Sequence, residues 1–310
     1  MPNPPLDYAL NFSGHESFPL RFSWLSKGYK SICDDSRFFG HDDSMIDLGV
    51  GKNMVSAIRH WGLTVQAWEE IPDTRGKELR PTEFGKGLFG KWDPFLEHAG
   101  TYWALHWNTV TNPFKATTWE IALNRPTTLF TPDALLQEVQ QHVEDKGERI
   151  PSSATLRRDI EVFKRSYLLP EKKKGVFQDD ELDCPFKQLG LLRPAVKSGE
   201  FELIAGARPS LPQAVFEYAL LKHMQKKGSN ERALASVEDL LYGLNSPGRV
   251  FRLTESALLD RLHLLTSAKP SQYLIDETVG LRQFIAESNA PQPLQALRSY
   301  YTNFLEPSHV

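Results

Sequence analysis

The sequence predicts a mainly α-helical protein with short β-strands, in which an N-terminal winged helix-turn-helix is followed by further helical, winged-helix-like units. The first observation is that apolar residues recur at helical spacing in pairs of segments separated by polar turns. The second is that short alternating stretches, which are typical of strands, follow paired helices. The pairs recur without a sequence repeat of fixed period. Such helix pairs are a frequent DNA-binding arrangement.

The first pair includes the stretch 47–61, which reads DLGVGKNMVSAIRHW. Helices predicted over 19–32 and 42–48 precede it, and Gly49 and Gly51 supply a tight turn. Beyond the turn, the apolar positions are Met54, Val55, Ile58 and Trp61, and the polar positions are Lys52, Asn53, Ser56, Arg59 and His60. These polar side chains can bond phosphates and base edges, so we interpret the stretch as a recognition helix. An ordinary amphipathic surface helix is the alternative.

A wing is predicted directly after this helix. The stretch 64–71 alternates enough for a strand, a polar link follows, and 79–90 is predicted as the second strand. Arg75, Lys77 and Arg80 would then lie along a DNA backbone. The glycines of GVGKN do not form a phosphate loop, because Ile46 and Asn53 stand where a Walker motif needs Gly and Ser or Thr. We therefore expect no nucleotide or haem cofactor.

The middle of the chain carries an aromatic segment and a second helix pair. Tyr102, Trp103, His106 and Trp107 lie close together in 93–112, where a core role is preferred over base stacking. A helix over 131–147 follows, and Ser152 or Ser153 caps another helix. Its predicted inner face consists of Ile160, Phe163, Tyr167 and Leu168, and its predicted outer face of Arg157, Arg158, Lys164 and Arg165 with Asp159. Lys172–Lys174 extend this basic face. A nucleic-acid-binding surface and an ordinary solvent-exposed charged face explain it equally well.

Two groups are candidates for catalysis. His15, Glu16 and Arg21 can form an acid–base and phosphate-binding cluster, although a buried ion pair that pins the N-terminal segment is the preferred alternative. Asp180 and Asp183, with Asp179 and Glu181 beside them, can hold Mg²⁺ through oxygen ligands. An acidic loop leading into a short helix is the preferred alternative for this second group.

A third helix pair and a strand hairpin are predicted in the C-terminal third. The helices cover 236–244 and 254–265, separated by the NSPG turn, and the hairpin is YLIDETVGLRQFIA. The predicted domains are a DNA-binding winged helix over 1–110, a helical middle region over 111–200 and a winged-helix-like region over 201–310.

Composition limits the class of protein. The formal net charge is −3, so a nucleic-acid surface must be a local patch, which excludes a histone-like binder but not a regulator or nuclease. Cys33 and Cys184 are the only cysteines and have no zinc-ligand spacing. Because no signal peptide or membrane span is apparent, we expect a cytoplasmic protein that does not enter a membrane.

Several distinctive strings occur together and carry a family resemblance: GHESFPLRFSWL, LGVGKNMVSAIRHW, LRPTEFG, TYWALHW, LRRDIEVFKRSY and LDCPFKQLGLL. In this order, from residue 12 to about residue 192, the chain resembles the SspB-like family of bacterial and archaeal proteins, with a looser likeness in RVFRLTE and YLIDETVGLRQF. SspB is the nickase component of single-stranded DNA phosphorothioation systems.

The resemblance implies DNA nicking together with a cysteine desulfurase, an ATPase and a sulfur transferase, as one half of an antiviral defence. It assigns no catalytic residues to this chain, and a homodimer stays open. The alternatives are a non-catalytic DNA-binding regulator or scaffold, and a protein-interaction module.

Overall fold

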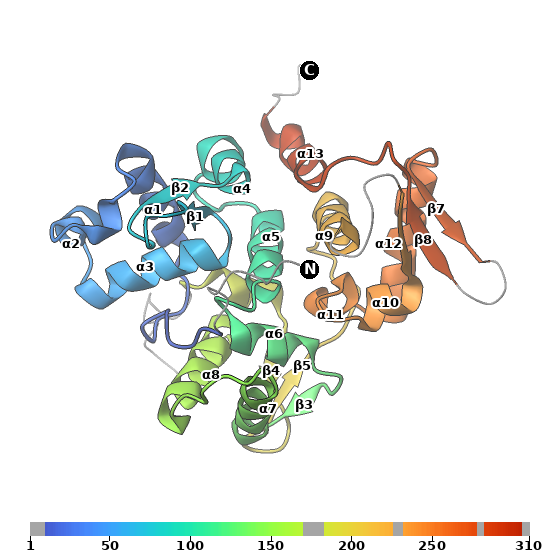
Figure 1. Ribbon diagram of the computed structural model, residues 1–310. Helices are drawn as coiled ribbons and strands as arrows, with labels where there is room; N and C mark the ends of the chain where they lie inside the picture. Colours follow the sequence, from blue (N-terminus) through green and yellow to red (C-terminus); the bar gives the residue numbers. More distant parts are fainter. Residues whose placement is uncertain (1–9, 170–182, 226–231, 278–281, 306–310) are drawn as a thin grey trace, which may run out of the picture.

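The computed structural model describes residues 10–169, 183–225, 232–277 and 282–305 (Figure 1). Within these residues the protein is mainly helical, and its short strands form a two-stranded and two three-stranded antiparallel sheets. The predicted α-rich fold with short strands is therefore confirmed. In the described part of the chain, no helix is long and apolar enough to cross a membrane.

The N-terminal region follows the predicted order up to the hairpin. It consists of α1 (Phe22–Asp34), α2 (Ser44–Leu48), α3 (Lys52–Thr64), β1 (Trp68–Glu70) and β2 (Leu79–Pro81). Gly49 ends α2 with φ 67°, a left-handed conformation that glycine adopts at little cost. β1 and β2 pair antiparallel, with Trp68 opposite Pro81.

The stretch 79–90 was predicted as one strand, and that prediction is wrong beyond Pro81. Helix α4 (Glu83–Gly87) follows at once and continues into a π-helical turn, Leu88–Trp92. The hydroxyl of Thr82 accepts a hydrogen bond from the amide of Gly85 at 3.0 Å. This N-cap satisfies a helix-terminal amide and so ends the strand.

The middle region pairs helices with a three-stranded sheet. Its elements are α5 (Ala99–Val110), α6 (Thr117–Asn124), β3 (Leu129–Phe130), α7 (Pro132–Asp145), α8 (Ser153–Tyr167), a 3₁₀ turn (Pro185–Leu189), β4 (Leu192–Pro194) and β5 (Phe201–Leu203). The strand order is β3-β5-β4. Ser152 caps α8, as predicted, by accepting from the amide of Thr155.

The C-terminal region repeats this strand order. Its elements are α9 (Gln213–Gln225), β6 (Ala233–Ser236), α10 (Val237–Tyr242), α11 (Pro247–Phe251), α12 (Glu255–Ala268), β7 (Tyr273–Asp276), β8 (Gln283–Ala286) and α13 (Pro293–Leu305). The sheet order is β6-β8-β7, and the predicted hairpin is present as β7 and β8. The NSPG turn opens α11, whose N-cap is Ser246.

Helix α5 of the middle region occupies the centre of the molecule, with the N-terminal and C-terminal regions on either side of it (Figure 1). Every residue from Gly100 to Val110 is buried, and α5 contacts α6, α9, α11 and the turn at Pro185–Leu189. The side-chain amide of Asn108 also donates to the carbonyl of Val65 at 3.0 Å. The core role predicted for the aromatic segment is thus confirmed, and the buried apolar residues form one continuous cluster.

Candidate nucleic-acid interface

Helix α3 presents most of the predicted polar face to solvent. His60, which was predicted on that face, is instead buried, because its ring packs against His15 and Trp61. Lys52, Asn53 and Ser56 are exposed, while Val55 and Ile58 are buried on the opposite side. The indole of Trp61 fixes the helix by donating to the carbonyl of Phe18 at 3.0 Å. The exposed side chains are therefore carried on a helix that is held rigidly against the core.

The basic residues of the wing differ in how they are neutralised. Arg59 pairs with Glu70 at 2.7 Å and donates to the carbonyl of Gly76 at 2.8 Å, so it braces the loop between β1 and β2. Arg80 pairs with Glu69 at 2.7 Å. Lys77 is exposed and has no ion-pair partner among the described residues. Of these three, Lys77 has the charge most available to a phosphate.

The predicted basic face of α8 is partly engaged in contacts within the protein. Arg157 pairs with Asp133, and Lys164 pairs with Glu161 at 2.8 Å. Arg165 donates to the carbonyl of Ser17. Arg158 is exposed and has no ion-pair partner in the described ranges. Surface ion pairs are weak, so the paired cations can exchange partners when a phosphate approaches.

Asp159 was predicted on the exposed face of this helix, and the structure corrects that placement. Its side chain is only 3% exposed. One carboxylate oxygen accepts from the His15 ring at 2.6 Å and from the amide of Ser13 at 3.0 Å. Burial of the carboxylate is tolerated because these donors replace water.

The predicted catalytic cluster does not come together around His15. The His15 ring is enclosed by aromatic side chains, with Trp61 stacked at 6.5 Å and Trp119 at 5.9 Å between centroids. Its Nδ1 accepts from the amide of Ser17 at 3.1 Å, which leaves Nε2 to donate to Asp159. This geometry favours the structural alternative, a buried pair that pins the N-terminal segment to α8.

The other catalytic candidates lie apart from that pair. Glu16 is exposed, and Arg21 pairs with Asp183 at 3.5 Å. Asp180 lies outside the described residues, as do Asp179, Glu181 and Lys172–Lys174. Across 10–169, 183–225, 232–277 and 282–305, no three His, Cys, Asp or Glu side chains gather closely enough to hold a metal ion.

A hollow of about 230 Å³ opens beside α3, between this helix and the segment that contains Asn11. Ser56, Arg59, His60 and Lys115 line it together with Asn11. Burial lowers the pKa of His60 to about 3, so the imidazole is neutral at physiological pH. The hollow thus combines hydrogen-bonding groups with two cationic side chains, Arg59 and Lys115.

A family model covers residues 12–301, almost the whole chain. The chain belongs to the DUF4007 family. This family is described only as a protein of unknown function. None of the curated proteins matches this DUF4007 protein.

Solved structures of SspB are similar to this DUF4007 protein over nearly its full length. One is a crystal structure of SspB and another is magnesium ion-bound SspB. Each has a TM-score of 0.84 and 28% sequence identity, and the match covers 99% of this chain and 93% of the SspB chain. The SspB-like resemblance of the sequence is therefore confirmed.

Sequence reasoning missed part of the surface beside α3. Arg37, Phe39 and His41 come from the link between α1 and α2, and Lys115 precedes α6. The link reads RFFGHDD, and basic and aromatic residues mixed in a loop are a usable signal for binding. Lys115 carries no such local signal.

Proposed function

We propose that this protein binds DNA and nicks one strand in a DNA phosphorothioation system linked to phage defence. The single observation that carries the proposal is the similarity to SspB over 99% of the chain. Its partners are then a cysteine desulfurase, an ATPase and a sulfur transferase, as the family resemblance implies.

We interpret the three regions as winged-helix units. The middle and C-terminal regions each run helix, strand, two or more helices and two strands, with the last strand in the centre of the sheet. In the N-terminal region, Ser36 takes the place of the first strand of the other units. Its carbonyl accepts a hydrogen bond from the amide of Leu79 at 2.9 Å. The helix that precedes the last two strands is α3 in the N-terminal unit, α8 in the middle unit and α12 in the C-terminal unit.

We assign DNA contact to α3 and α8, because both carry exposed cations. The 13–17 segment joins them, since His15 contacts both Asp159 of α8 and the ring of Trp61 of α3. Helix α12 instead exposes acidic and apolar residues, Glu255, Asp260 and Leu264. That composition suits a protein partner better than a phosphate backbone.

Binding is tested with the double variant Lys52→Ala/Arg158→Ala. We expect affinity for duplex DNA to fall by about tenfold per residue near 0.1 M salt, and the salt slope to decrease by about 2, because each cation releases a phosphate counterion. The matched control is Arg232→Ala/Arg298→Ala, which removes two charges from the C-terminal region. Equal affinities for the two double variants would show that Lys52 of α3 and Arg158 of α8 do not contact DNA.

Nicking is tested with supercoiled plasmid in Mg²⁺ and in EDTA. We expect conversion to open circle only with the metal, since we propose a Mg²⁺ requirement. The described residues do not supply a three-ligand metal group, so no step is assigned to the ion. Binding without conversion would favour the non-catalytic scaffold, and salt-insensitive binding would favour an interaction module.

Asp183 is the member of the predicted acidic group that lies within the described residues, and 40% of its side chain is exposed. We expect Asp183→Ala to abolish nicking and to leave gel-shift affinity unchanged. Asp133→Ala, which removes the partner of Arg157, is the matched control. Nicking at the wild-type rate by Asp183→Ala would exclude this carboxylate from catalysis.

The scaffold alternative has its own support in the C-terminal sheet. Leu234 of β6 and Leu274 of β7 both lie opposite Ile285 of β8, and they are 50% and 42% exposed. Apolar side chains grouped on one sheet face suit a protein contact. The plasmid assay separates the two functions, because only the nickase converts the substrate.

A further inference from the structure

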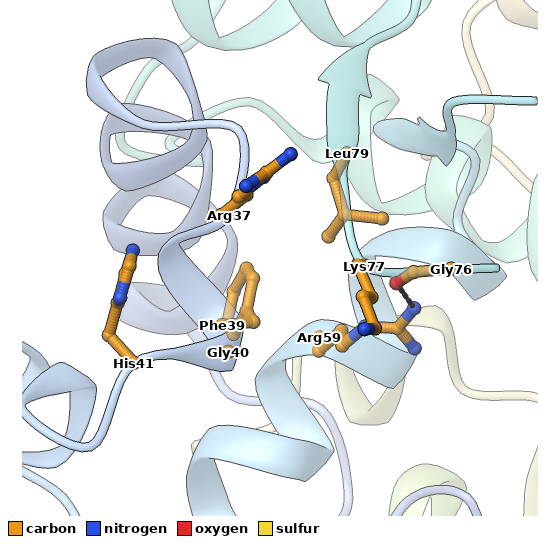
Figure 2. A pocket seen from close by; sticks show the side chains of 8 residues that line it. All are labelled: Arg37, Phe39, Gly40, His41, Arg59, Gly76, Lys77 and Leu79. Atoms are coloured by element: carbon orange, nitrogen blue, oxygen red, sulfur yellow. Dashed lines mark hydrogen bonds between the residues drawn. The ribbon is translucent and has the colours of Figure 1, made fainter. Parts of the chain in front are cut away.

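A cavity of about 420 Å³ lies between the link that follows α1 and the hairpin loop beside α3. Figure 2 shows Arg37, Phe39 and His41 on one side of it and Arg59, Lys77 and Leu79 on the other. Its volume falls within the roughly 300–1,000 Å³ of small-molecule sites. The cavity therefore has room for more than a single phosphate group.

One wall of the cavity is apolar and fixed in place. The ring of Phe39 meets Phe38 edge-on at 5.4 Å between centroids and lies tilted against Trp68 at 6.0 Å. Leu79 also lines the cavity but is only 1% exposed, so the partly exposed Phe39 presents most of the apolar surface. A held aromatic ring at the edge of a cavity suits the face of a nucleobase, because every base can stack on it.

The rest of the cavity is cationic. Arg37 has 67% of its side chain exposed, and Lys77 is also exposed. Arg59 stays in place through Glu70 and the carbonyl of Gly76. No carboxylate is among the described residues that line the cavity.

The acids that neutralise these cations lie outside the lining. Arg37 donates from Nε to Glu78 at 2.9 Å, and the His41 ring is 2.7 Å from Asp35. An anion that enters the cavity therefore meets guanidinium and ammonium groups without a facing carboxylate.

We propose that this cavity binds one nucleotide turned out of the DNA helix, with its base against Phe39 and its phosphate between Arg37 and Lys77. The inference rests on the proposed function, and it specifies which part of the DNA binds in this cavity. An apolar wall beside a cationic rim matches the two halves of a nucleotide. Turning a nucleotide out exposes the face of its base, which is otherwise stacked inside the duplex, to such an apolar wall.

The test uses three short duplexes of the same sequence: fully paired, with one extrahelical adenine, and with one extrahelical abasic residue. We expect the extrahelical adenine to raise affinity about tenfold over the paired duplex, because unstacking is already complete and the base can stack. The abasic residue should not give this gain. Phe39→Leu keeps an apolar side chain and should remove the gain, which is measured within the variant as the ratio of its affinities for the extrahelical-adenine duplex and the paired duplex.

Arg37→Ala is the second variant, because Arg37 is mostly exposed and its loss does not disturb the core. It should reduce the gain, whereas Arg193→Ala should not. Arg193 is a matched control, since it is 59% exposed and pairs with Glu202 as Arg37 pairs with Glu78.

Several outcomes would overturn the inference. Equal affinity for all three duplexes, or a gain that survives Phe39→Leu, excludes the base from the cavity. An equal gain from the abasic residue means that only a phosphate is held. Binding to none of the three duplexes would overturn the proposed function as well, so the two failures are distinguishable.

Discussion

Acidification from pH 8 to pH 5 is expected to lower the free energy of unfolding by about 4 kcal/mol through two buried histidines. Burial lowers the pKa of His60 to about 3 and that of His106 to about 4. In the unfolded chain the histidine pKa is about 6.5. The unfolded state therefore binds more protons between these values, and stability falls as the pH drops below about 6.5.

The effect of each histidine follows from its contacts. His106 lies between the Tyr167 hydroxyl and the Val250 carbonyl, both at 2.8 Å, so one ring nitrogen accepts and the other donates. A second proton on this ring would prevent Nδ1 from accepting the Tyr167 hydrogen bond and would place a charge in the core. At pH 5 each of these histidines lowers the free energy of unfolding by about 2 kcal/mol, because its ring is protonated in the unfolded chain and neutral in the folded protein.

Urea unfolding measured from pH 8 to pH 5 checks this prediction. His60→Gln and His106→Gln should each retain about 2 kcal/mol of the pH-dependent difference, half of the wild-type value. Exposed His263→Gln is the control and should retain all of it. A wild-type stability that is flat over this range would contradict the assignment of both rings as neutral.

Asp159→Ala is expected to destabilise the protein by about 3 kcal/mol, since it leaves a buried ring donor and a backbone amide without an acceptor. The same oxygen accepts from His15 and Ser13, so both hydrogen bonds are lost together. Asp159→Asn keeps an oxygen acceptor and should cost about 1 kcal/mol. The measurements are urea unfolding and hydrogen exchange at the Ser13 amide, which should exchange faster in Asp159→Ala.

Asp133→Ala is the control, because Asp133 makes an exposed pair with Arg157 and should cost less than about 1 kcal/mol. Wild-type stability of Asp159→Asn together with lost nicking would give the His15–Asp159 pair a catalytic role. Destabilisation with nicking retained would confirm that the pair is structural.

Local signals predicted most of the helices and the C-terminal hairpin. Thr131 and Ser152 accept hydrogen bonds from amides three residues later, as capping residues do. Caps and apolar periodicity depend only on neighbours in the chain, so one sequence is enough to read them. Helix α13 was missed although it carries signals of the same kind, with Pro293 at its first position and Leu294, Leu297 and Tyr301 at helical spacing.

The candidate interface was predictable only in part. The exposed positions Lys52, Asn53 and Ser56 follow from helical spacing around buried Val55 and Ile58. The cavity beside them does not, because Arg37 and Lys77 belong to separate loops that meet only in the folded chain. Asp159 shows the same limit, since its partner His15 is 144 residues away.

The sequence by itself determined the α-rich order of elements, the polar face of α3 and the resemblance to the SspB-like family. Those properties depend on spacing and on recurring strings along the chain. Only the tertiary structure decided which charges are available, because Arg59, Arg80 and Arg157 are neutralised by carboxylates while Lys77 has no ion-pair partner among the described residues. Coulomb interactions depend on distance in space, and the fold alone sets that distance.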